Sequence, residues 1–356
     1  MKERVICFTD HLGNGGAQRQ LVGLACMLKE KGYDVSVVLY YNNPFYKPML
    51  DEAGIKSVIV KNSNYIVRIW SMFKYFRKHK GASIIAYQET PSLISCMLRP
   101  FIKCRKLIVS ERNTTQTLTK MDKLRFWLYR FADYVVPNSY SQAEFLRKTA
   151  PKLKHKIVPI TNFVDTEYFK PAQTSDFSTK RTNTVVVIGR DDPQKNFHRF
   201  IDAIKILADE RINIHAKWYG ITKKRIEEFK AYVKNQGLSS YVDIYEPTLN
   251  ISEAYISADF FCLPSLFEGF PNVLCEAISS GLPVACSNVC DNPYIMSKVD
   301  GGIMFNPLDV EDIADKLKQL ILISNEEWLK YATMNRQVAV ESFSKEAFID
   351  KYCRLL

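Results

Sequence analysis

The sequence lacks the features that mark membrane-spanning and secreted proteins. No stretch of the sequence comes near the about 20 consecutive apolar residues that a membrane-spanning helix needs. The amino terminus passes from charged residues straight into a short apolar run, without the long apolar stretch of a signal peptide. The nine cysteines are scattered and include no Cys-x-x-Cys pair, which favours reduced buried thiols over disulfides or a cysteine metal site. We therefore expect a cytoplasmic protein whose membrane contact is peripheral, on the inner face of the cytoplasmic membrane.

Several catalytic motifs are missing as well. The five histidines have no metal-ligand spacing and no Asp-x-Asp motif accompanies them, so we expect neither a metal nor a bound cofactor. The sequence contains no Gly-x-Ser-x-Gly elbow, which leaves a serine nucleophile unsupported. The glycines at 13–16 do not have the Gly-x-Gly-x-x-Gly spacing of a dinucleotide fingerprint.

Charge is present but unevenly distributed. Residues 1–165 hold 27 Lys and Arg against 12 Asp and Glu, whereas residues 166–356 hold 22 against 26, so the net charge of +11 divides into +15 and −4. A basic half joined to a mildly acidic half suggests that the first half faces an anionic partner such as phospholipid, lipid diphosphate or nucleic acid. An ordinary solvated basic surface accounts for the same count.

The 356 residues are about twice the length of a typical domain, and the pattern along them repeats. Short β-branched runs alternate with amphipathic helical stretches, which predicts an α/β fold of parallel sheets with crossover helices. The alternation pauses over the polar stretch 162–183, the expected linker between domains 1–165 and 166–344. We expect the terminal helix, 345–356, to pack back onto the first domain. The predicted elements of the first half are 5–9, 17–31, 35–40, 58–60, 67–79, 83–87, 107–110, 123–131 and 134–137, and the predicted strands of the second half are 184–188, 214–219, 242–245, 260–263 and 284–286.

The segment 260–277 has the strongest chemical signature. An apolar strand runs into a tight loop and then a helix, and ligands of parallel sheets bind where loops follow strands. Pro271 suits the first helical position, because its missing N–H has no acceptor there. The amides that follow Pro271 would point from the helix N-terminus toward an anion such as the β-phosphate of a nucleotide. The predicted donor-binding residues here are Phe270, Pro271, Asn272, Val273, Leu274 and Glu276.

Two carboxylates flank this helix start. Glu276, about one turn into the helix, is placed to accept hydrogen bonds from ribose hydroxyls, and Glu268 in the loop is placed to reach the sugar. Their E-x7-E spacing resembles that of the retaining GT-B glycosyltransferases of the large family four group. Three further stretches resemble motifs of that family in matching order: residues 162–165, with Phe163 replacing the glycine of N-G-V-D; residues 188–190 followed by Lys195 and Asn196, like G-R and K-N; and residues 300–305, like D-G-x-L-F.

The resemblance implies two Rossmann-like parallel-sheet domains that face each other across a cleft. It implies an enzyme that moves a hexosyl or N-acetylhexosaminyl group, with retention, from a UDP-linked sugar to a membrane-associated or lipid-linked glycan in polysaccharide, capsule or O-antigen synthesis. A sugar-nucleotide epimerase or hydrolase uses the same scaffold and remains an alternative. A non-enzymatic basic module that binds membrane or nucleic acid is a second alternative, but it leaves Glu268 and Glu276 unexplained.

Arg190 and Lys195 follow a predicted buried strand. Two cations at that position can neutralise a diphosphate leaving group. The family resemblance implies that this pair carries much of the catalysis, and the backbone of Gly189 lies beside it in the motif. We therefore predict Arg190, Lys195 and Glu268 as catalytic residues, with Gly189 in the donor site.

The first strand also opens into a glycine-containing loop. Gly15 and Gly16 let backbone amides approach a phosphate or an acceptor, and the loop resembles the G-G-A-E/Q loop of the family. Two departures from the family affect the site. Glu111 and Arg112 stand where many relatives carry a histidine, and they either contact the acceptor or donor sugar or form a structural salt bridge. Residues 291–294 stand where the family often has G-G-x-P-E.

Two segments mix aromatic and basic residues, 68–80 and 98–106. Such surfaces rest on anionic lipid, with basic groups at the headgroups and aromatic rings at the boundary. Core helices with basic outer faces give the same pattern. We expect a nucleotide-sugar donor, a lipid-linked acceptor and an anionic membrane surface as partners, and no nucleic acid.

Overall fold

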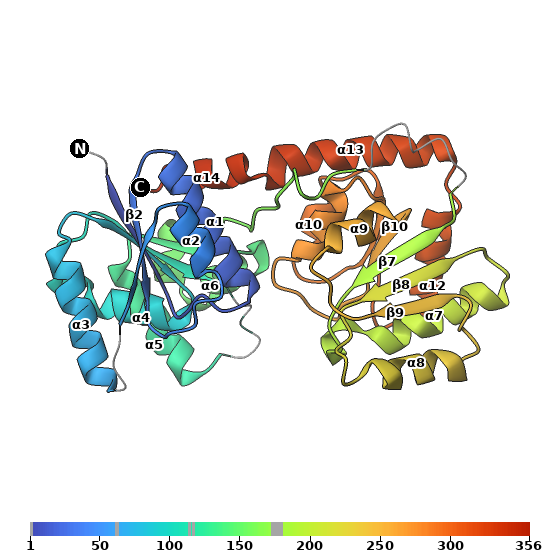
Figure 1. Cartoon of the computed structure of the whole chain (residues 1–356), viewed down its shortest axis with the longest axis horizontal. Helices are drawn as coiled ribbons and strands as arrows, with labels where there is room; N and C mark the ends of the chain where they lie inside the picture. The colour runs from blue at the N-terminus through green and yellow to red at the C-terminus, as the bar shows by residue number, and fades with distance from the viewer. Residues whose placement is uncertain (1–2, 61–63, 113–114, 116–117, 172–180) are drawn as a thin grey trace. The chain divides into compact units, whose positions relative to one another are not determined.

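The computed structural model describes residues 3–60, 64–112, 115, 118–171 and 181–356, and the chain divides into two compact units (Figure 1). Unit 1 consists of Met1–Asn162 and Lys345–Leu356, and unit 2 consists of Phe163–Ser344. Each unit is built on one six-stranded parallel sheet with flanking helices, so the predicted α/β class is confirmed.

The sheet of unit 1 has the strand order β3-β2-β1-β4-β5-β6. Its central strand, β1 (Arg4–Thr9), pairs in parallel with β2 and β4, and the residues from Val5 to Thr9 are all buried. Strands covered on both faces are continuous apolar runs, which is why the sequence pattern marks them clearly. The other strands are β2 (Asp34–Leu39), β3 (Lys56–Ile59), β4 (Ser83–Tyr87), β5 (Leu107–Glu111) and β6 (Tyr134–Pro137).

Helices cover both faces of this sheet. One layer is formed by α3, α4 and α5, which share a core with the alternate strand residues Ile6 and Phe8. The helices α1, α2 and α14 pack together in unit 1. The helices of unit 1 are α1 (Gly16–Glu30), α2 (Lys47–Glu52), α3 (Tyr65–Lys78), α4 (Glu89–Leu98), α5 (Lys120–Leu128), α6 (Tyr140–Thr149) and α14 (Lys345–Cys353), with short 3-10 turns η1 (Arg99–Phe101), η2 (Tyr129–Phe131) and η3 (Pro151–Lys156).

The sheet of unit 2 repeats the topology of the first. Its order, β12-β11-β10-β7-β8-β9, reverses between β7 and β10 as the first sheet reverses between β1 and β4. Its strands are β7 (Thr184–Ile188), β8 (His215–Tyr219), β9 (Val242–Tyr245), β10 (Phe260–Leu263), β11 (Val284–Ser287) and β12 (Gly302–Phe305).

Two cores hold the helices of unit 2 against this sheet. One surrounds the buried Trp218 of β8, and the other packs α10 against the end of α13. The helices are η5 (Pro193–Lys195), α7 (Phe197–Asp209), α8 (Ile226–Asn235), α9 (Ile251–Ile256), α10 (Asn272–Ser279), α11 (Asn292–Met296), α12 (Val310–Ile321) and α13 (Asn325–Phe343). In the described ranges, no helix combines the length and apolarity required to cross a bilayer.

The chain joins the two units in the region predicted as the linker. Phe163 and Val164, which the predicted boundary assigned to the first domain, are buried in unit 2. The residues 172–180 of the predicted linker lie outside the described residues. At the other junction, α14 belongs to unit 1, where Asp350 pairs with Lys31 at 3.4 Å.

Candidate functional site

The strand order of each sheet identifies one place where a ligand is expected. In open α/β sheets, ligands bind outside the carboxyl ends of the strands where the strand order reverses. In unit 2 this point lies between β7 and β10, so the loops after these two strands form its walls. The loop after β7 carries Arg190 and Lys195, and the loop after β10 carries Glu268.

Lys195 and Glu268 meet at this point. The Nζ atom of Lys195 lies 2.5 Å from Oε1 of Glu268, and the two side chains are only 14% and 11% exposed. Charged hydrogen bonds are stronger where water is largely excluded. The two loops therefore present a tightly bound ammonium–carboxylate pair at the switch point.

Backbone and amide hydrogen bonds hold the two loops together. The Leu266 amide donates to the Gln194 carbonyl at 2.8 Å, and the Gln194 side chain donates to the Phe267 carbonyl at 2.6 Å. The buried Asn196 donates to the carbonyls of Pro264 and Pro307 at 3.0 and 2.7 Å. Its backbone is left-handed (φ 59°), a conformation that asparagine tolerates better than most residues. The loop geometry is thus fixed by contacts on both sides of Lys195.

Gly189 lies where no side chain fits without displacement. A Cβ atom there would meet Cγ of Lys195 and Cζ2 of Trp218, each at 3.2 Å. The carbonyl of Gly189 accepts the indole N–H of Trp218 at 2.8 Å, and its amide donates to the Tyr219 carbonyl at 2.9 Å. Glycine therefore lets Lys195 pack against the end of β7.

Arg190 is arranged differently from Lys195. Its side chain is 75% exposed, and its ion pair in the described structure is with Asp192 at 3.7 Å. The structure thus brings Lys195 to Glu268 rather than pairing the two cations in one buried cluster. An exposed guanidinium next to the site is available to an arriving anion at little desolvation cost.

The N-terminus of α10 follows the Glu268 loop. The helix begins at Asn272, and Pro271 is its N-cap with a ψ of 89°, so Pro271 stands one residue before the first helical position that we predicted. The amide of Leu274 donates to the Pro271 carbonyl at 3.1 Å. The amides of the first turn of an α-helix point toward its N-terminus, so an anion placed there would face the start of α10.

Glu276 and Phe270 lie deeper in unit 2. Glu276 is 5% exposed, and its Oε2 lies 3.0 Å from the hydroxyl of Tyr255. Phe270 is also buried, with its ring 6.2 Å from that of Phe343 in the core. The carboxylate of Glu276 is therefore held from the side of α9, and Phe270 anchors the loop that precedes α10.

The sequence analysis missed Cys290, which contacts the Glu268 loop. Its sulfur accepts the backbone N–H of Glu268 at 3.5 Å, and the residue is exposed with a left-handed backbone (φ 51°). Burial raises the pKa of the Cys290 thiol, and the carboxylates of Asp291 and Glu268 add to the effect. Its position in the loop after β11 was the available signal, since loops that follow strands carry the site.

Unit 1 has its own switch point between β1 and β4. Gly15 is the N-cap of α1 in an extended conformation, and a Cβ atom there would collide with the Gln18 side chain. Gly16 is the exposed first residue of α1. Gly15 thus lets the chain turn closely over Gln18 in the loop between β1 and α1.

Two further polar residues at this point were not predicted. Gln88 follows β4 with a left-handed backbone (φ 75°), and its Oε1 accepts hydrogen bonds from Thr9 at 3.1 Å and Gln18 at 3.3 Å. Asp10 follows β1, and burial, together with the Glu89 carboxylate, raises the pKa of Asp10 to about 6. Both are the first polar residues after a buried strand, which was the signal that identified the loops of unit 2.

Glu111, the last residue of β5, lies in a charged cluster. It is 1% exposed, pairs with the guanidinium of Arg125 at 3.1 Å and accepts a hydrogen bond from the Tyr129 hydroxyl. Burial raises the pKa of Glu111, and the charge of Arg125 opposes that shift. The salt bridge of Glu111 is therefore with Arg125 and not with its neighbour in the sequence.

Arg112 lies in a second, separate cluster. It donates to Asn162 Oδ1 at 2.9 Å, to the Tyr352 hydroxyl at 3.0 Å and to the Tyr87 hydroxyl. Its guanidinium also lies 3.9 Å from the centre of the Tyr87 ring. Arg112 thus links three parts of unit 1. It contacts β4 through Tyr87, the end of the first chain segment at Asn162, and α14 through Tyr352.

Within the described ranges, no three His, Cys, Asp or Glu side chains are grouped so that they could hold a metal ion. The polar groups gathered at the unit 2 switch point instead suit a polyanion with hydroxyl groups. The ammonium of Lys195, the guanidinium of Arg190 and the start of α10 complement negative charge, whereas Glu268 and Glu276 are acceptors for hydroxyls.

Comparisons with known proteins agree across the chain. Two family models match: Glycosyltransferase Family 4 over residues 14–168 and Glycosyl transferases group 1 over residues 182–322. The amylovoran biosynthesis glycosyltransferase AmsD of Erwinia amylovora is 24% identical over 310 residues, which cover 85% of each chain. An N-acetyl-D-galactosaminyltransferase of Campylobacter jejuni, whose name gives a diphospho-undecaprenol-linked acceptor, is 26% identical over 75% of this chain and 74% of its own. The crystal structure of Anabaena Alr3699/HepE in complex with UDP has a TM-score of 0.84, with 18% identity over 99% of both chains.

Proposed function

Because the chain belongs to the GT-B glycosyltransferases of group 1, we propose that it transfers a hexosyl or N-acetylhexosaminyl group from a UDP-sugar to a lipid-linked or membrane-held glycan acceptor. The acceptor would be an intermediate of a bacterial capsule, O-antigen or other surface polysaccharide. Two observations on similar proteins support these choices: Anabaena HepE was solved with UDP and with UDP-glucose, and the Campylobacter jejuni relative is named for a diphospho-undecaprenol acceptor.

The proposed donor site lies at the switch point of unit 2. The diphosphate is held by the Lys195 ammonium, the Arg190 guanidinium and the amides of Asn272 and Val273 at the start of α10. These groups stabilise the charge that develops on the diphosphate as it leaves, which is the largest single contribution in many transferases. Glu276 accepts hydrogen bonds from the ribose hydroxyls.

The proposed reaction retains the configuration at C1 of the sugar. The bond between C1 and the diphosphate oxygen breaks, and the acceptor oxygen forms its bond to C1 on the same face. The acceptor proton passes to the departing phosphate oxygen. Glu268 supports this route over a covalent one, because its carboxylate is already bound by Lys195 and is therefore a weaker nucleophile. Its role in the proposal is to accept hydrogen bonds from the sugar hydroxyls.

The observation that carries the proposal is the contact between Lys195 and Glu268. It joins the loops after β7 and β10 at the one point of this sheet where ligands are expected. In the proposal, the cation of the first loop binds phosphate and the carboxylate of the second binds the sugar. An epimerase or hydrolase on the same fold needs no acceptor. A transferase therefore consumes the donor and the acceptor together, whereas these enzymes consume the donor alone.

The test uses purified full-length protein with a panel of UDP-sugars and undecaprenyl-diphosphate glycans. We expect nucleotide release that requires an acceptor, and a product whose anomeric configuration, measured by NMR, equals that of the donor. Nucleotide or sugar release at the same rate without acceptor would show a hydrolase, and an inverted product would overturn the proposed route. Lys205→Met, an exposed lysine paired with Asp209 on α7, is a control that should leave the rate unchanged.

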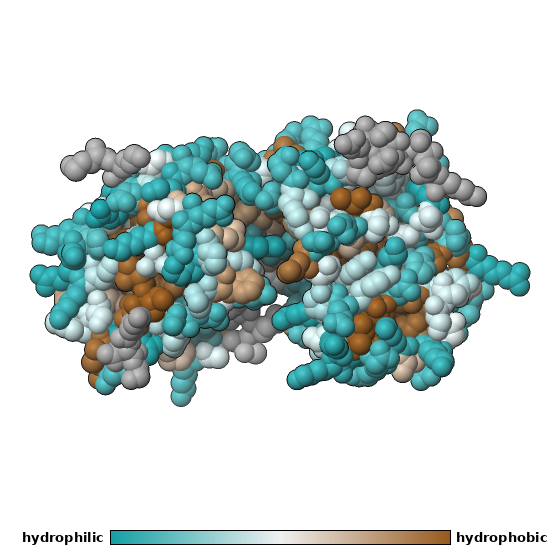
Figure 2. All heavy atoms as spheres, viewed as in Figure 1, coloured by the Kyte–Doolittle hydropathy of each residue, from teal (hydrophilic) through white to brown (hydrophobic). Residues whose placement is uncertain are grey.

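We also propose that unit 1 rests on an anionic membrane, where the acceptor is held. The two aromatic and basic segments, 68–80 and 98–106, meet in a wholly apolar groove of about 380 Å³ between α3 and η1. Ile66, Trp70 and Phe101 at this groove are 76%, 54% and 68% exposed. Figure 2 shows an apolar patch on unit 1 near the places of α3 and α4 in Figure 1. Exposed aromatic side chains among basic residues are typical of surfaces that enter the headgroup region.

A further inference from the structure

Gln88 stands at the switch point of unit 1 with part of its hydrogen-bonding capacity unused. It directly follows β4, and Asp10 directly follows the neighbouring strand β1. The Oε1 atom of Gln88 accepts hydrogen bonds from the Thr9 hydroxyl at 3.1 Å and from Nε2 of Gln18 at 3.3 Å. Its own Nε2 donates to no residue that the structure describes. Two N–H groups of Gln88 are therefore available to a ligand.

The two groups that hold Oε1 are themselves fixed in the protein. Thr9 and Gln18 are both buried. Gln18 lies against Gly15, where a Cβ atom would collide with the Oε1 atom of Gln18. The amide of Gln88 is therefore oriented by buried groups that hold its oxygen, which leaves its nitrogen on the other side.

The backbone of Gln88 is strained. Its φ of 75° and ψ of 179° lie in a region that is occupied almost only by glycine. Hydrogen bonds on both sides maintain this conformation, from the Gln88 amide to the Ser110 carbonyl at 3.0 Å and from the Ser92 amide to the Gln88 carbonyl at 3.2 Å. Residues held in such regions cluster at active sites and ligand-binding positions. The backbone thus agrees with the unused N–H groups in indicating a binding role for Gln88.

Asp10 supplies a complementary group beside Gln88. Neighbouring strands lie about 5 Å apart, so the loops that begin at Asp10 and Gln88 start side by side. The Oδ1 atom of Asp10 has no hydrogen-bond partner among the described residues. Burial raises the pKa of Asp10 to about 6, and above that pH its carboxylate only accepts hydrogen bonds. One hydroxyl can accept from Gln88 and donate to Asp10, since two hydrogen bonds through its oxygen span about 5–6 Å.

The charges beside Gln88 favour a neutral ligand over a phosphate. Asp10 and Glu89 are both acids, and Glu89 pairs with Arg125 at 3.2 Å. The residue that follows the next strand, Arg112, is buried and bonded to neutral side chains. An anion at this point would be repelled by the Asp10 carboxylate, whereas a sugar hydroxyl would be bound by it.

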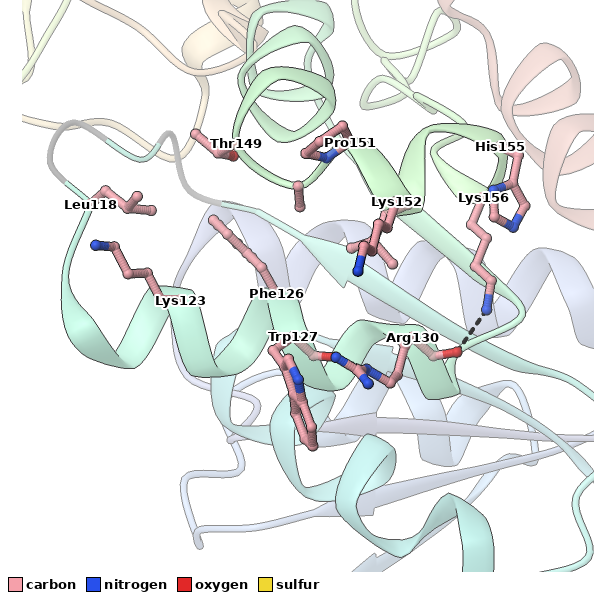
Figure 3. Close-up of a pocket in the computed structure, with 12 residues that line it drawn as sticks. Leu118, Lys123, Phe126, Trp127, Arg130, Thr149, Pro151, Lys152, His155 and Lys156 are labelled. Atoms are coloured by element: carbon pink, nitrogen blue, oxygen red, sulfur yellow. Dashed lines mark hydrogen bonds between the residues drawn. The ribbon is translucent and has the colours of Figure 1, made fainter.

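The basic groove of unit 1 is a poorer match for a sugar hydroxyl. This groove has a volume of about 670 Å³ and lies between α5–η2 and the end of α6 with η3 (Figure 3). Its lysines and arginines are Lys123, Arg130, Lys152 and Lys156, and no Asp or Glu is among the described residues that line it. A hydroxyl bound there would find charged donors but no carboxylate to accept its hydrogen. The groups that follow β1 and β4 therefore suit a neutral sugar better.

We propose that Gln88 and Asp10 bind the acceptor sugar through one of its hydroxyls. Nε2 of Gln88 donates to the oxygen of this hydroxyl, and the hydroxyl donates to the carboxylate of Asp10. It is a hydroxyl other than the attacking one, because the attacking hydroxyl gives its proton to the leaving phosphate. The inference rests on the proposed function, which places the acceptor at unit 1, and it assigns this point to the neutral sugar of the acceptor rather than to its diphosphate.

The first experiment replaces Gln88 by glutamate. The carboxylate of Gln88→Glu still accepts from Thr9 and Gln18, but it has no N–H to donate and leaves two carboxylates facing one hydroxyl hydrogen. In the acceptor-dependent assay we expect the KM for the acceptor to rise about tenfold, with the KM for the UDP-sugar within twofold and the urea midpoint near that of the wild type. Gln337→Glu, which adds the same charge at an exposed position of α13, is the control and should change neither KM. An unchanged KM for the acceptor, or an equal rise in the KM for the UDP-sugar, would overturn the proposal.

The second experiment measures sugar binding without a nucleotide, so this inference and the proposed function can fail separately. Saturation-transfer NMR of the full chain is recorded with free galactose, glucose, mannose, N-acetylgalactosamine and N-acetylglucosamine at millimolar concentration. We expect transfer to at least one of these sugars, reduced severalfold in Gln88→Glu and unchanged in Lys152→Gln, an exposed lysine of the basic groove. The absence of transfer to all of them would contradict the inference. Transfer that is lost in Lys195→Met but kept in Gln88→Glu would contradict it too, because the sugar would then be bound at the donor site.

Discussion

Replacing Lys195 by methionine should stop turnover at a small cost in stability. The substitution keeps the length of the side chain and removes the ammonium that lies 2.5 Å from Glu268. We expect kcat to fall about 100- to 1000-fold, the effect of losing one group that stabilises the leaving charge, which corresponds to about 3–4 kcal/mol of activation free energy.

The stability effect of the same change follows from the burial of the pair. Removing one partner of a fully buried ion pair costs about 3–5 kcal/mol, and a charged hydrogen bond contributes about 1.5–3 kcal/mol. The Lys195 and Glu268 side chains keep 14% and 11% exposure, so water can still reach the remaining carboxylate. We expect a loss of about 2 kcal/mol in the free energy of unfolding of unit 2. A domain stable by about 5–15 kcal/mol stays folded after that loss, so unfolding at 25 °C does not account for lost activity.

The assay is the initial rate of acceptor-dependent nucleotide release at saturating donor, with urea unfolding followed in parallel. Glu268→Gln should give a smaller loss of kcat, about 10- to 100-fold, since it removes sugar contacts and leaves the cation. Lys205→Met serves as the control at an exposed lysine. If Lys195→Met loses about 2 kcal/mol of stability but retains kcat within a few fold, Lys195 has only a structural role and the reasoning is refuted.

Three other substitutions test the account. Gly189→Ala places a methyl group against Lys195 and Trp218 at 3.2 Å. We expect kcat/KM, measured by kinetics, to be about tenfold lower, with a nearly unchanged circular dichroism spectrum. An unchanged kcat/KM would show that the position of Lys195 does not depend on this contact. Arg112→Ala removes the bonds to Asn162 and Tyr352, so hydrogen exchange in α14 should become faster and stability should fall by about 3 kcal/mol, whereas unchanged protection of α14 would contradict the role of Arg112. For Asp10, the pKa in the folded state (about 6) is above its ordinary value of 3.8, so the folded protein binds the extra proton between these values and stability falls as pH rises from about 4 to about 6. Asp10→Asn should remove this part of the pH dependence of the free energy of unfolding, which is at most about 3 kcal/mol and less after solvent screening. The check is the urea midpoint of both proteins between these pH values. Midpoints that change with pH in the same way in the two proteins would contradict the reasoning.

The strands were the part of the fold that the sequence predicted best. The observed bounds of β4, β6, β7, β9 and β10 equal the predicted ones. Four of these strands are largely buried, mostly apolar runs between polar loops, and the edge strand β9 alternates buried and less buried residues. The edge strand β12 was not predicted, since it begins with Gly302 and is only partly buried. The helix α4 was missed because it contains Pro91 and two serines, Ser92 and Ser95, which are poor signals of a helix. Its position is set by packing between α5 and β5.

The site was predictable as a set of loops but not as a set of contacts. Lys195 and Glu268 are 73 residues apart in the sequence, and the local spacing of residues does not reveal the strand order that brings their loops together. The sequence analysis predicted that Arg190 and Lys195 both act on the diphosphate, and it did not identify the contact of Lys195 with Glu268 or the exposure of Arg190. The terminal helix was expected to pack on the first domain, and unit 1 does include Lys345–Leu356. The contact of Arg112 with Tyr352 spans 240 residues, however, and no local pattern identifies these two residues as partners.

Diffraction from crystals of the full chain grown with UDP tests the central claim most directly. The account predicts diphosphate density within hydrogen-bond distance of Lys195 Nζ and the amides of Asn272 and Val273, with the ribose against Glu276. Density for the diphosphate at the loops of unit 1, or at any place in unit 2 that Lys195 does not reach, would contradict it.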